Sequence, residues 1–168
     1  MNSKIDIKIC TIDMLTDLQY LCRTTFSETF SDSTDEEDMR KFLAETYSAE
    51  KLSAELANSE SVTFIAYKNG TPLGYLKLNI GNAQTEKCLD NALEIQRIYI
   101  LKSAKGQGIG SAFMQIAENF ASEKNFQQYG SVYGNITSLQ RNSTNQKDMK
   151  NFHNTHLSSV TICKPISF

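Results

Sequence analysis

The sequence has little of what marks membrane, secreted or nucleic-acid-binding proteins. No apolar run in its 168 residues approaches the roughly 20 residues that span a bilayer. The N-terminal stretch MNSKIDIKIC has neither the long apolar core nor the small-residue cleavage site of a signal peptide. The net charge is -2 and there is no basic stripe, which argues against a nucleic-acid surface. We therefore expect a cytoplasmic protein that binds neither nucleic acid nor membrane.

Metal-binding patterns are also missing. None of the four cysteines forms a CxxC pair, and they are too scattered for a zinc site: Cys10, Cys22, Cys88 and Cys163. We interpret Cys10 and Cys22 as small core residues in a reducing compartment. We expect no metal site.

The periodicity of apolar residues predicts a single α/β domain over 1–168, which suits the length of the chain and its 40% apolar content. The first helix is expected to bury Ile12 and to be capped by Thr11 or Asp13. The last helix is expected to turn Ile109 and Phe113, with Ile116, Ala117 and Phe120, toward the core. In chain order the pattern predicts a strand at 5–11, helices at 11–26, 32–47 and 48–59, a hairpin around Asn69-Gly70 at 61–81, a strand at 92–101 and a helix at 108–125.

A glycine-spaced loop, KGQGIG at 105–110, lies between the last predicted strand and helix. A helix N-terminus offers unpaired backbone N–H groups and partial positive charge, and glycine lets a phosphate approach the backbone closely. The alternative is a tight turn that needs glycine only for its conformation. The spacing matches neither the GxGxxG of a Rossmann fold nor the GxxxxGK[ST] of a Walker loop.

The residues around this loop carry a resemblance. LEIQRIYILKSAKGQGIGSAF resembles the acyl-coenzyme A signature of the GNAT superfamily of N-acetyltransferases, [RQ]-x-x-G-x-[GA], with Lys105 as a departure in the first position. Over about residues 4–128 the chain is similar to the PaiA-type spermidine/spermine acetyltransferases of bacilli. The resemblance implies the GNAT fold, a mixed and mostly antiparallel central sheet flanked by helices. It also implies acetyl-CoA as cosubstrate and a small amine, for example a polyamine, as acceptor.

The resemblance assigns cofactor contacts to a strand and to the loop that follows it. The strand would pair its backbone with the pantetheine arm, and backbone amides of the loop would cradle the pyrophosphate, with Lys105 as a cation at the rim. Glu94 is the candidate general base that deprotonates the amine through water; the alternative is a solvated acid at a strand end. The cofactor residues implied are Ile98, Tyr99, Ile100, Lys105, Gly106, Gln107, Gly108, Ile109, Gly110 and Ser111.

Two further features leave alternatives open. The acidic run DSTDEED at 32–38 would attract a polycationic acceptor, or it is an N-cap with a solvated first helical turn. Tyr75 and Tyr99 are interpreted as packing residues. A homodimer and a monomer are both compatible with the sequence.

The organisation stops near Gln128. Residues 1–128 contain 11 Glu and 11 Ala, whereas 129–168 contain neither and hold both histidines, His153 and His156. The resemblance implies a later helix with an Asn and a Phe-Tyr pair, whose Tyr would be the general acid; Thr144 stands in its place. Suitable codons shifted by one base restore these motifs at the family spacing. We therefore interpret 129–168 as an out-of-frame tail, non-native or disordered apart from a short strand near Tyr129–Tyr133.

Two functions follow as hypotheses. The first is direct acetyl transfer from acetyl-CoA to a small amine, without a covalent acyl-enzyme. The second is a catalytically impaired coenzyme A-binding remnant or regulatory module, because the C-terminal motifs are lost.

Overall fold

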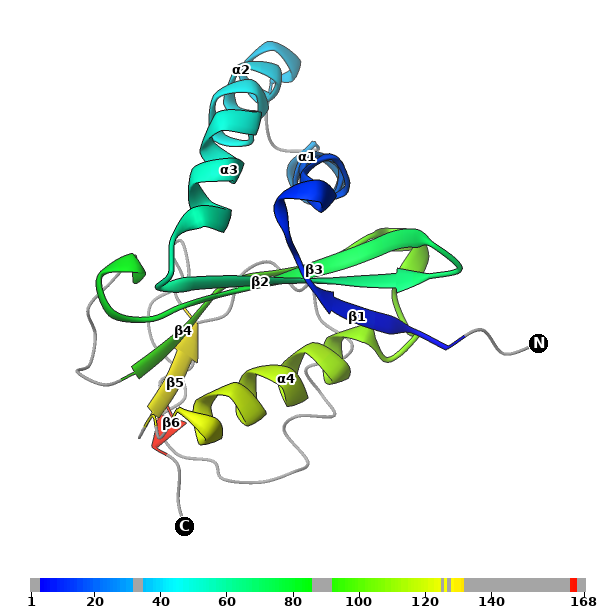
Figure 1. The fold of residues 1–168 in the computed structure, drawn as a ribbon. Coiled ribbons are helices and arrows are strands. Elements are labelled where there is room, and N and C mark those ends of the chain that lie inside the picture. Colours follow the sequence, from blue (N-terminus) through cyan, green and yellow to red (C-terminus); the bar gives the residue numbers. More distant parts are fainter. Residues whose placement is uncertain are drawn as a thin grey trace.

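A sheet whose strands lie in chain order forms the centre of the molecule. The computed structural model describes residues 4–31, 35–85, 92–124, 126, 128–131 and 164–165 (Figure 1). Within these ranges the sheet has six strands, antiparallel except for the parallel pair β4–β5. The strands are β1 (Asp6–Ile9), β2 (Ser61–Lys68), β3 (Thr71–Asn79), β4 (Ala92–Ile100), β5 (Gln128–Ser131) and β6 (Lys164–Pro165). The mixed, mostly antiparallel sheet that the sequence predicts is therefore confirmed.

Helices cover both faces of this sheet. Helices α1, α2 and α3 lie on one side and α4 lies on the other (Figure 1). The helices are α1 (Leu15–Phe30), α2 (Glu36–Thr46), α3 (Ala49–Ala57) and α4 (Ile109–Glu123), with 3-10 turns η1 (Ile12–Met14), η2 (Gly81–Ala83) and η3 (Lys102–Ala104). The order of elements is the predicted one, and the described helix boundaries differ from the predicted ones by a few residues.

Local sequence explains where most elements begin. The Asp35 carboxylate accepts hydrogen bonds from the backbone N–H groups of Glu37 and Asp38, and Ser48 Oγ accepts one from Lys51 N, so α2 and α3 have side-chain caps. Between β2 and β3, Asn69 and Gly70 take φ values of 51° and 77°. Two consecutive positive φ angles are typical of the tight hairpin turns that Asn-Gly favours, so the predicted hairpin is confirmed.

The start of α1 differs from its prediction. The chain first makes the 3-10 turn η1, and α1 begins at Leu15 without a side-chain cap. The Thr11 hydroxyl donates to the Asp13 carboxylate instead of capping the helix. Ile12 is 61% exposed, because it belongs to the turn and not to the buried helical face. The capping and burial predictions were therefore wrong at these residues.

The core lies between the helices and the sheet. On α4, Ile109, Phe113 and Ala117 are buried as predicted, while Ile116 and Phe120 pack at the margin of the core. The cysteines Cys10 and Cys22 are buried as well. Burial raises the pKa of the Cys22 thiol to about 11 and that of Cys10 to about 12, so both remain protonated at neutral pH. Their interpretation as core residues is confirmed.

The described ranges also bear on membranes and metals. None of the helices there combines the length and apolar character that crossing a bilayer requires. In the same part of the chain, no three His, Cys, Asp or Glu side chains come together as metal ligands would. His153 and His156 lie outside the described residues.

The strand expected after the last helix is present. Its backbone pairs with β4 in parallel, with Gln128 opposite Ala92 and Ser131 opposite Ile95. A short strand beside β4 was predicted, and it is confirmed over Gln128–Ser131. Predictions about residues 132–163 and 166–168, including the position of Thr144, lie outside the described residues.

Candidate functional site at the end of strand β4

The glycine loop continues directly from β4 into α4. Leu101 N donates to Leu73 O at 2.9 Å, which holds the end of β4 against β3, and η3 then turns the chain toward the loop. Gly106 and Gly108 have φ values of +77° and +81°, a conformation that L side chains rarely adopt. A Cβ atom at either glycine would meet nothing within 4 Å. The backbone conformation, and not crowding by protein atoms, therefore requires glycine here.

The loop ends at an open helix N-terminus. Gly108 is the N-cap of α4 and supplies no side-chain cap, and its carbonyl accepts the first helical hydrogen bond, from Ala112 N at 3.1 Å. The backbone N–H groups of Ile109 and Gly110 precede that bond and have no acceptor within the helix. A Cβ on Gly110 would lie 3.5 Å from Ile100 Cδ1, so the first turn of α4 packs closely on β4. The loop therefore leads, as expected, into a helix whose first backbone N–H groups have no acceptor within the helix, and phosphate binding there stays a prediction.

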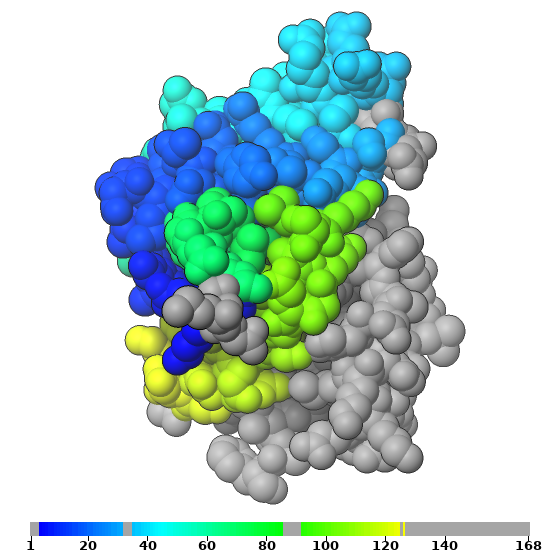
Figure 2. Space-filling model, turned by 90° about the vertical axis from the view of Figure 1, so that its right-hand side faces the viewer, coloured from blue at the N-terminus to red at the C-terminus, as the bar shows by residue number. Residues whose placement is uncertain are grey.

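A hydrogen bond joins this loop to the β2–β3 hairpin. Lys68 Nζ donates to Gln107 Oε1 at 2.9 Å, and Lys105 and Gln107 are both exposed. The space-filling view shows the hairpin tip and the loop side by side on one face (Figure 2). Lys68 is a neighbour of the loop that the sequence did not indicate.

Among the residues that the structure describes, β4 has a strand partner on its β5-facing edge along only part of its length. β5 pairs only with Ala92–Ile95, so within the described ranges the edge of Gln96–Ile100 that faces β5 has none. The side chains of this half contribute to packing: Ile98 is buried, and Tyr99 stacks on the buried Tyr75 with ring centroids 5.8 Å apart. In this half of β4, backbone N–H and C=O groups, and not the packed side chains, would be available to bind an extended ligand. The packing interpretation of Tyr75 and Tyr99 is confirmed.

A bulge interrupts β4 at the same place. Leu78 lies opposite Ile95, but the next residue of β3, Lys77, lies opposite Arg97. Gln96 is therefore an extra residue, and its Nε2 donates to Thr85 Oγ1 at 2.9 Å. As a result Glu94 and Arg97, three positions apart, project toward the same face of the sheet, the face that α1 and α3 cover.

Glu94 is buried in a polar network. It is 4% exposed, and its Oε2 accepts a hydrogen bond from Asn79 Nδ2 at 2.8 Å. The backbone N–H of Thr85 donates to both carboxylate oxygens at 3.1 Å. The alternative interpretation of Glu94 as a solvated strand-end acid is therefore wrong. The sequence did not point to Asn79 and Thr85, because neither belongs to a motif.

Comparison with known proteins decides the family. The family model described as "Acetyltransferase (GNAT) family" matches residues 17–139, more than half of the chain. The chain belongs to this family. An uncharacterized N-acetyltransferase in the pepI 3' region of Lactobacillus delbrueckii subsp. lactis is 40% identical over 98 residues. That match covers 58% of this chain and 57% of the relative's length.

Solved acetyltransferases share the fold. The PaiA N-acetyltransferase from Thermoplasma acidophilum, in complex with coenzyme A, superposes with a TM-score of 0.72 at 20% identity, covering 97% of this chain and 99% of that one. A GCN5-related N-acetyltransferase from Ralstonia eutropha gives a TM-score of 0.62 at 16% identity, over 84% of this chain and all (100%) of that one. The predicted GNAT fold is confirmed.

A buried charge cluster lies on the same face of the acetyltransferase sheet as Glu94. Arg97 donates to both carboxylate oxygens of Glu55, on α3, at 2.8 and 3.1 Å, and Lys77 Nζ lies 2.8 Å from Glu55 Oε2. Burial and the neighbouring Arg97 lower the pKa of Lys77. Burial alone would raise the pKa of Glu55, but the two cations outweigh it and lower that pKa. This cluster was not predicted from the sequence. The feature that could have indicated it is the presence of one cationic residue in each of two mostly apolar strands, Lys77 in β3 and Arg97 in β4.

The acidic run lies at the start of α2. Asp35 is its N-cap, and Glu37 forms an exposed ion pair with Lys41 at 2.8 Å. The capping interpretation is confirmed at Asp35, while Glu36, Glu37 and Asp38 remain exposed carboxylates in the first turn. Residues 32–34 lie outside the described ranges.

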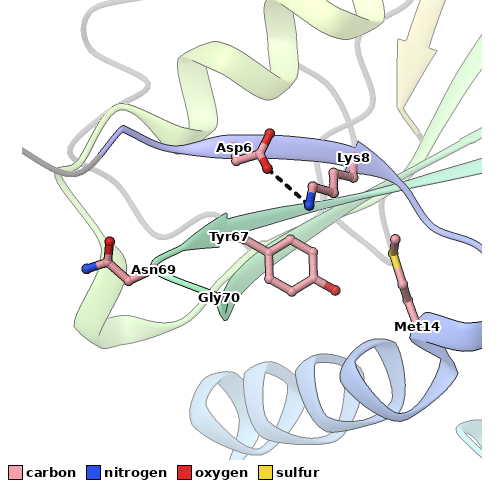
Figure 3. A pocket seen from close by; sticks show the side chains of 6 residues that line it. All are labelled: Asp6, Lys8, Met14, Tyr67, Asn69 and Gly70. Atoms are coloured by element: carbon pink, nitrogen blue, oxygen red, sulfur yellow. Dashed lines mark ion pairs between the residues drawn. The ribbon is translucent and has the colours of Figure 1, made fainter.

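A surface pocket of about 380 Å³ lies at the turn of the β2–β3 hairpin, beside β1 (Figure 3). Lys8 lies between Asp6, at 3.2 Å, and the ring of Tyr67, whose hydroxyl donates to Asp17 at 2.8 Å. The pocket is lined by Asp6, Lys8, Met14, Tyr67, Asn69 and Gly70, and contains none of the predicted site residues.

Proposed function

We propose that this chain transfers the acetyl group of acetyl-CoA to a primary amine of a small molecule. The observation that carries the proposal is the junction of two features: within the described residues the edge of β4 over Gln96–Ile100 has no strand partner, and α4 begins beside it with no side-chain cap. The first suits an extended amide-containing arm, and the second suits a pyrophosphate. Acetyl-CoA carries both groups in one molecule and supplies the activated acetyl group.

The chain's own residues would divide the binding between them. Backbone amides of Gly106, Gly108, Gly110 and Ser111 would bind the pyrophosphate, and Lys105 would add a mobile charge at the rim. The β4 backbone at Ile98–Ile100 would hold the arm and direct an N–H group at the acetyl carbonyl. Neither task needs a specific side chain on β4, which fits the inward packing of Ile98 and Tyr99.

Glu94 would act as the general base. An amine is protonated at neutral pH and must lose a proton before it attacks a carbonyl. The hydrogen bonds that Glu94 accepts from the described residues come from N–H donors, which suits an ionised carboxylate. Because the group is buried in the sheet, a water molecule would carry the proton to it.

For the acceptor we propose a polyamine such as spermidine or spermine. The support is the exposed acidic first turn of α2 and the fold likeness to the PaiA N-acetyltransferase. The test combines calorimetric titration with acetyl-CoA and a thiol-release assay with spermidine. Binding of coenzyme A without thiol release from any amine would contradict acetyl transfer.

A second candidate function rests on the composition of the tail. Residues 129–168 contain no Glu and no Ala, and Thr144 stands where the family pattern has a Tyr. We propose that this tail is out of frame, so that the chain as written is a coenzyme A-binding remnant of a PaiA-type enzyme with impaired turnover. Reading the DNA around codon 128 tests this directly: a gene without a one-base shift relative to its relatives would contradict it.

A further inference from the structure

A chain of hydrogen bonds crosses three strands and ends at Glu94. Ser61 Oγ, on β2, donates to Asn79 Oδ1, on β3, at 2.8 Å, and Asn79 Nδ2 donates to Glu94 Oε2, on β4, at 2.8 Å. The three residues are direct neighbours in the sheet register, Ser61 opposite Asn79 and Asn79 opposite Glu94. Asn79 is 1% exposed, so its amide is sequestered from solvent. Both ends of the amide are therefore satisfied by protein groups.

The donor and acceptor groups determine the direction of these hydrogen bonds. An Asn amide has one donor end and one acceptor end. Because an ionised carboxylate can only accept, the donor end faces Glu94, and the Ser61 hydroxyl donates to the acceptor end that remains. A reversed amide would place a carbonyl oxygen against the carboxylate, which only a protonated Glu94 could accommodate.

The Thr85 backbone completes the enclosure of the carboxylate. Its N–H donates to both oxygens of Glu94, and Gln96 Nε2 donates to Thr85 Oγ1. A carboxylate has about four acceptor positions, and the described residues occupy three of them, which leaves one among these residues for a further donor. That remaining position can hold the water through which a base acts.

The place of this network in the sheet argues against a purely structural role. Burying a carboxylate is costly, and apolar residues of similar volume often fill such a position at no loss of stability. Here the buried carboxylate lies on β4 beside Ile95, the last residue that pairs with β5. It is therefore next to the point beyond which β4 has no β5 partner among the described residues.

We propose that Asn79 is the positioning residue of the catalytic base: it holds the Glu94 carboxylate by its amide N–H, and Ser61 orients that amide. This inference rests on the proposed function, in which Glu94 is the base.

The test compares isosteric variants in the full chain. Asn79→Asp keeps the shape but replaces the donor by an acceptor, and Ser61→Ala removes the orienting hydroxyl. We expect Asn79→Asp to lower kcat for spermidine acetylation by about 10²-fold, as displacement of a catalytic group does, and Ser61→Ala by about fivefold. Affinity for acetyl-CoA, measured by calorimetry, should stay within about twofold, a split that a general loss of folding would not produce. Asn119→Asp, the same change on the exposed face of α4, is the matched control.

Glu94→Gln tests the proposed base itself, independently of the positioning role of Asn79. If Glu94→Gln retains full turnover, the proposed base fails. If Glu94→Gln loses turnover but Asn79→Asp does not, the base stands and the positioning role of Asn79 is overturned.

A second measurement applies whether or not the chain turns over. By NMR, the Asn79 side-chain amide and the Thr85 backbone N–H should exchange at least about tenfold more slowly than the Asn119 side-chain amide, because both are hydrogen-bonded and sequestered. Glu94→Ala should remove this protection. Exchange of the Asn79 amide as fast as that of Asn119 would overturn the proposal.

Discussion

Arg97 on β4 and Glu55 on α3 face each other in a two-point ion pair, with N–O distances of 2.8 and 3.1 Å. Lys77 shares one of the Glu55 oxygens and is 4% exposed. Among the described residues, Glu55 is thus the anionic partner that both cations share. This pair connects α3 to the strand that carries the proposed base.

Glu55→Gln should destabilise the fold by about 2–3 kcal/mol, because it leaves Lys77 and Arg97 without their anion in a partly buried site. Chemical denaturation measures the effect. Glu50→Gln, an exposed change on the same helix, serves as the control and should cost less than about 0.5 kcal/mol. Equal stability of the two variants would show that the cluster contributes nothing.

The same pair should make stability depend on acid. The pKa of Glu55 is lower in the folded chain than its ordinary value of 4.5, because the two cations outweigh the effect of burial. Its contribution is therefore complete above pH 4.5 and is lost as the pH falls through the lower, folded value. Melting between pH 6 and pH 3 should show a smaller acid loss in Glu55→Gln than in the unaltered chain.

Gly108→Val should weaken binding of acetyl-CoA by about tenfold or more, because a branched residue at φ +81° distorts the loop and crowds the phosphate position. Titration calorimetry with acetyl-CoA measures this. Gly70→Val is the matched control, since it puts the same residue at a similar φ of +77° in the hairpin turn, outside the proposed phosphate site. An unchanged affinity in folded Gly108→Val would exclude the loop from the site.

In the acidic first turn of α2, Asp35 has a structural role as the N-cap, whereas Glu36 and Glu37 would act by attracting a cationic acceptor. Asp35→Ala should cost about 1 kcal/mol of stability, because the cap is lost. Glu36→Gln with Glu37→Gln should leave stability nearly unchanged but raise KM for spermidine and flatten its dependence on salt. Steady-state kinetics at two salt concentrations measure both, and an unchanged KM would leave this turn with capping alone.

Deleting one base near codon 128, so that the position of Thr144 encodes Tyr, should give a more cooperative thermal transition and restore acetyl transfer to spermidine. The physical reason is that the sequence as written offers few apolar residues between Asn135 and Asn154, too little burial to offset the entropy of ordering. The two versions should be compared by melting, amide exchange and turnover. Comparable turnover in both would contradict the reading-frame hypothesis.

Local chemistry made most of the fold predictable. Asp35 caps α2 and Asn69-Gly70 turns the hairpin because each acts on its own backbone within a few residues. The glycine loop was recognisable for the same reason. Ile12 was misplaced because its spacing fits a helix, whereas the chain makes a 3-10 turn first.

The interior of the candidate site was not predictable in the same way. The contacts Asn79–Glu94 and Glu55–Arg97 join residues 15 and 42 positions apart. They depend on strand register and on how α3 packs on the sheet, and no local signal encodes either. The sequence could identify Glu94 as a candidate base, but only the structure shows that Glu94 is buried and which groups donate hydrogen bonds to it.

The extra residue Gln96 divides β4 into two stretches of opposite phase. In an uninterrupted strand, Glu94 and Ile98 would share one face, and Arg97 would point to the other. With one residue inserted, Glu94, Arg97 and Tyr99 share a face, while Ile98 joins the layer beneath α4. If the bulge were flattened so that Gln96 took a regular place in the ladder, the Arg97 guanidinium would point into that apolar layer and Glu55 would lose its two-point partner. The bulge at Gln96 therefore determines which side chains beyond it share a face with Glu94 and which lie in the apolar layer against α4.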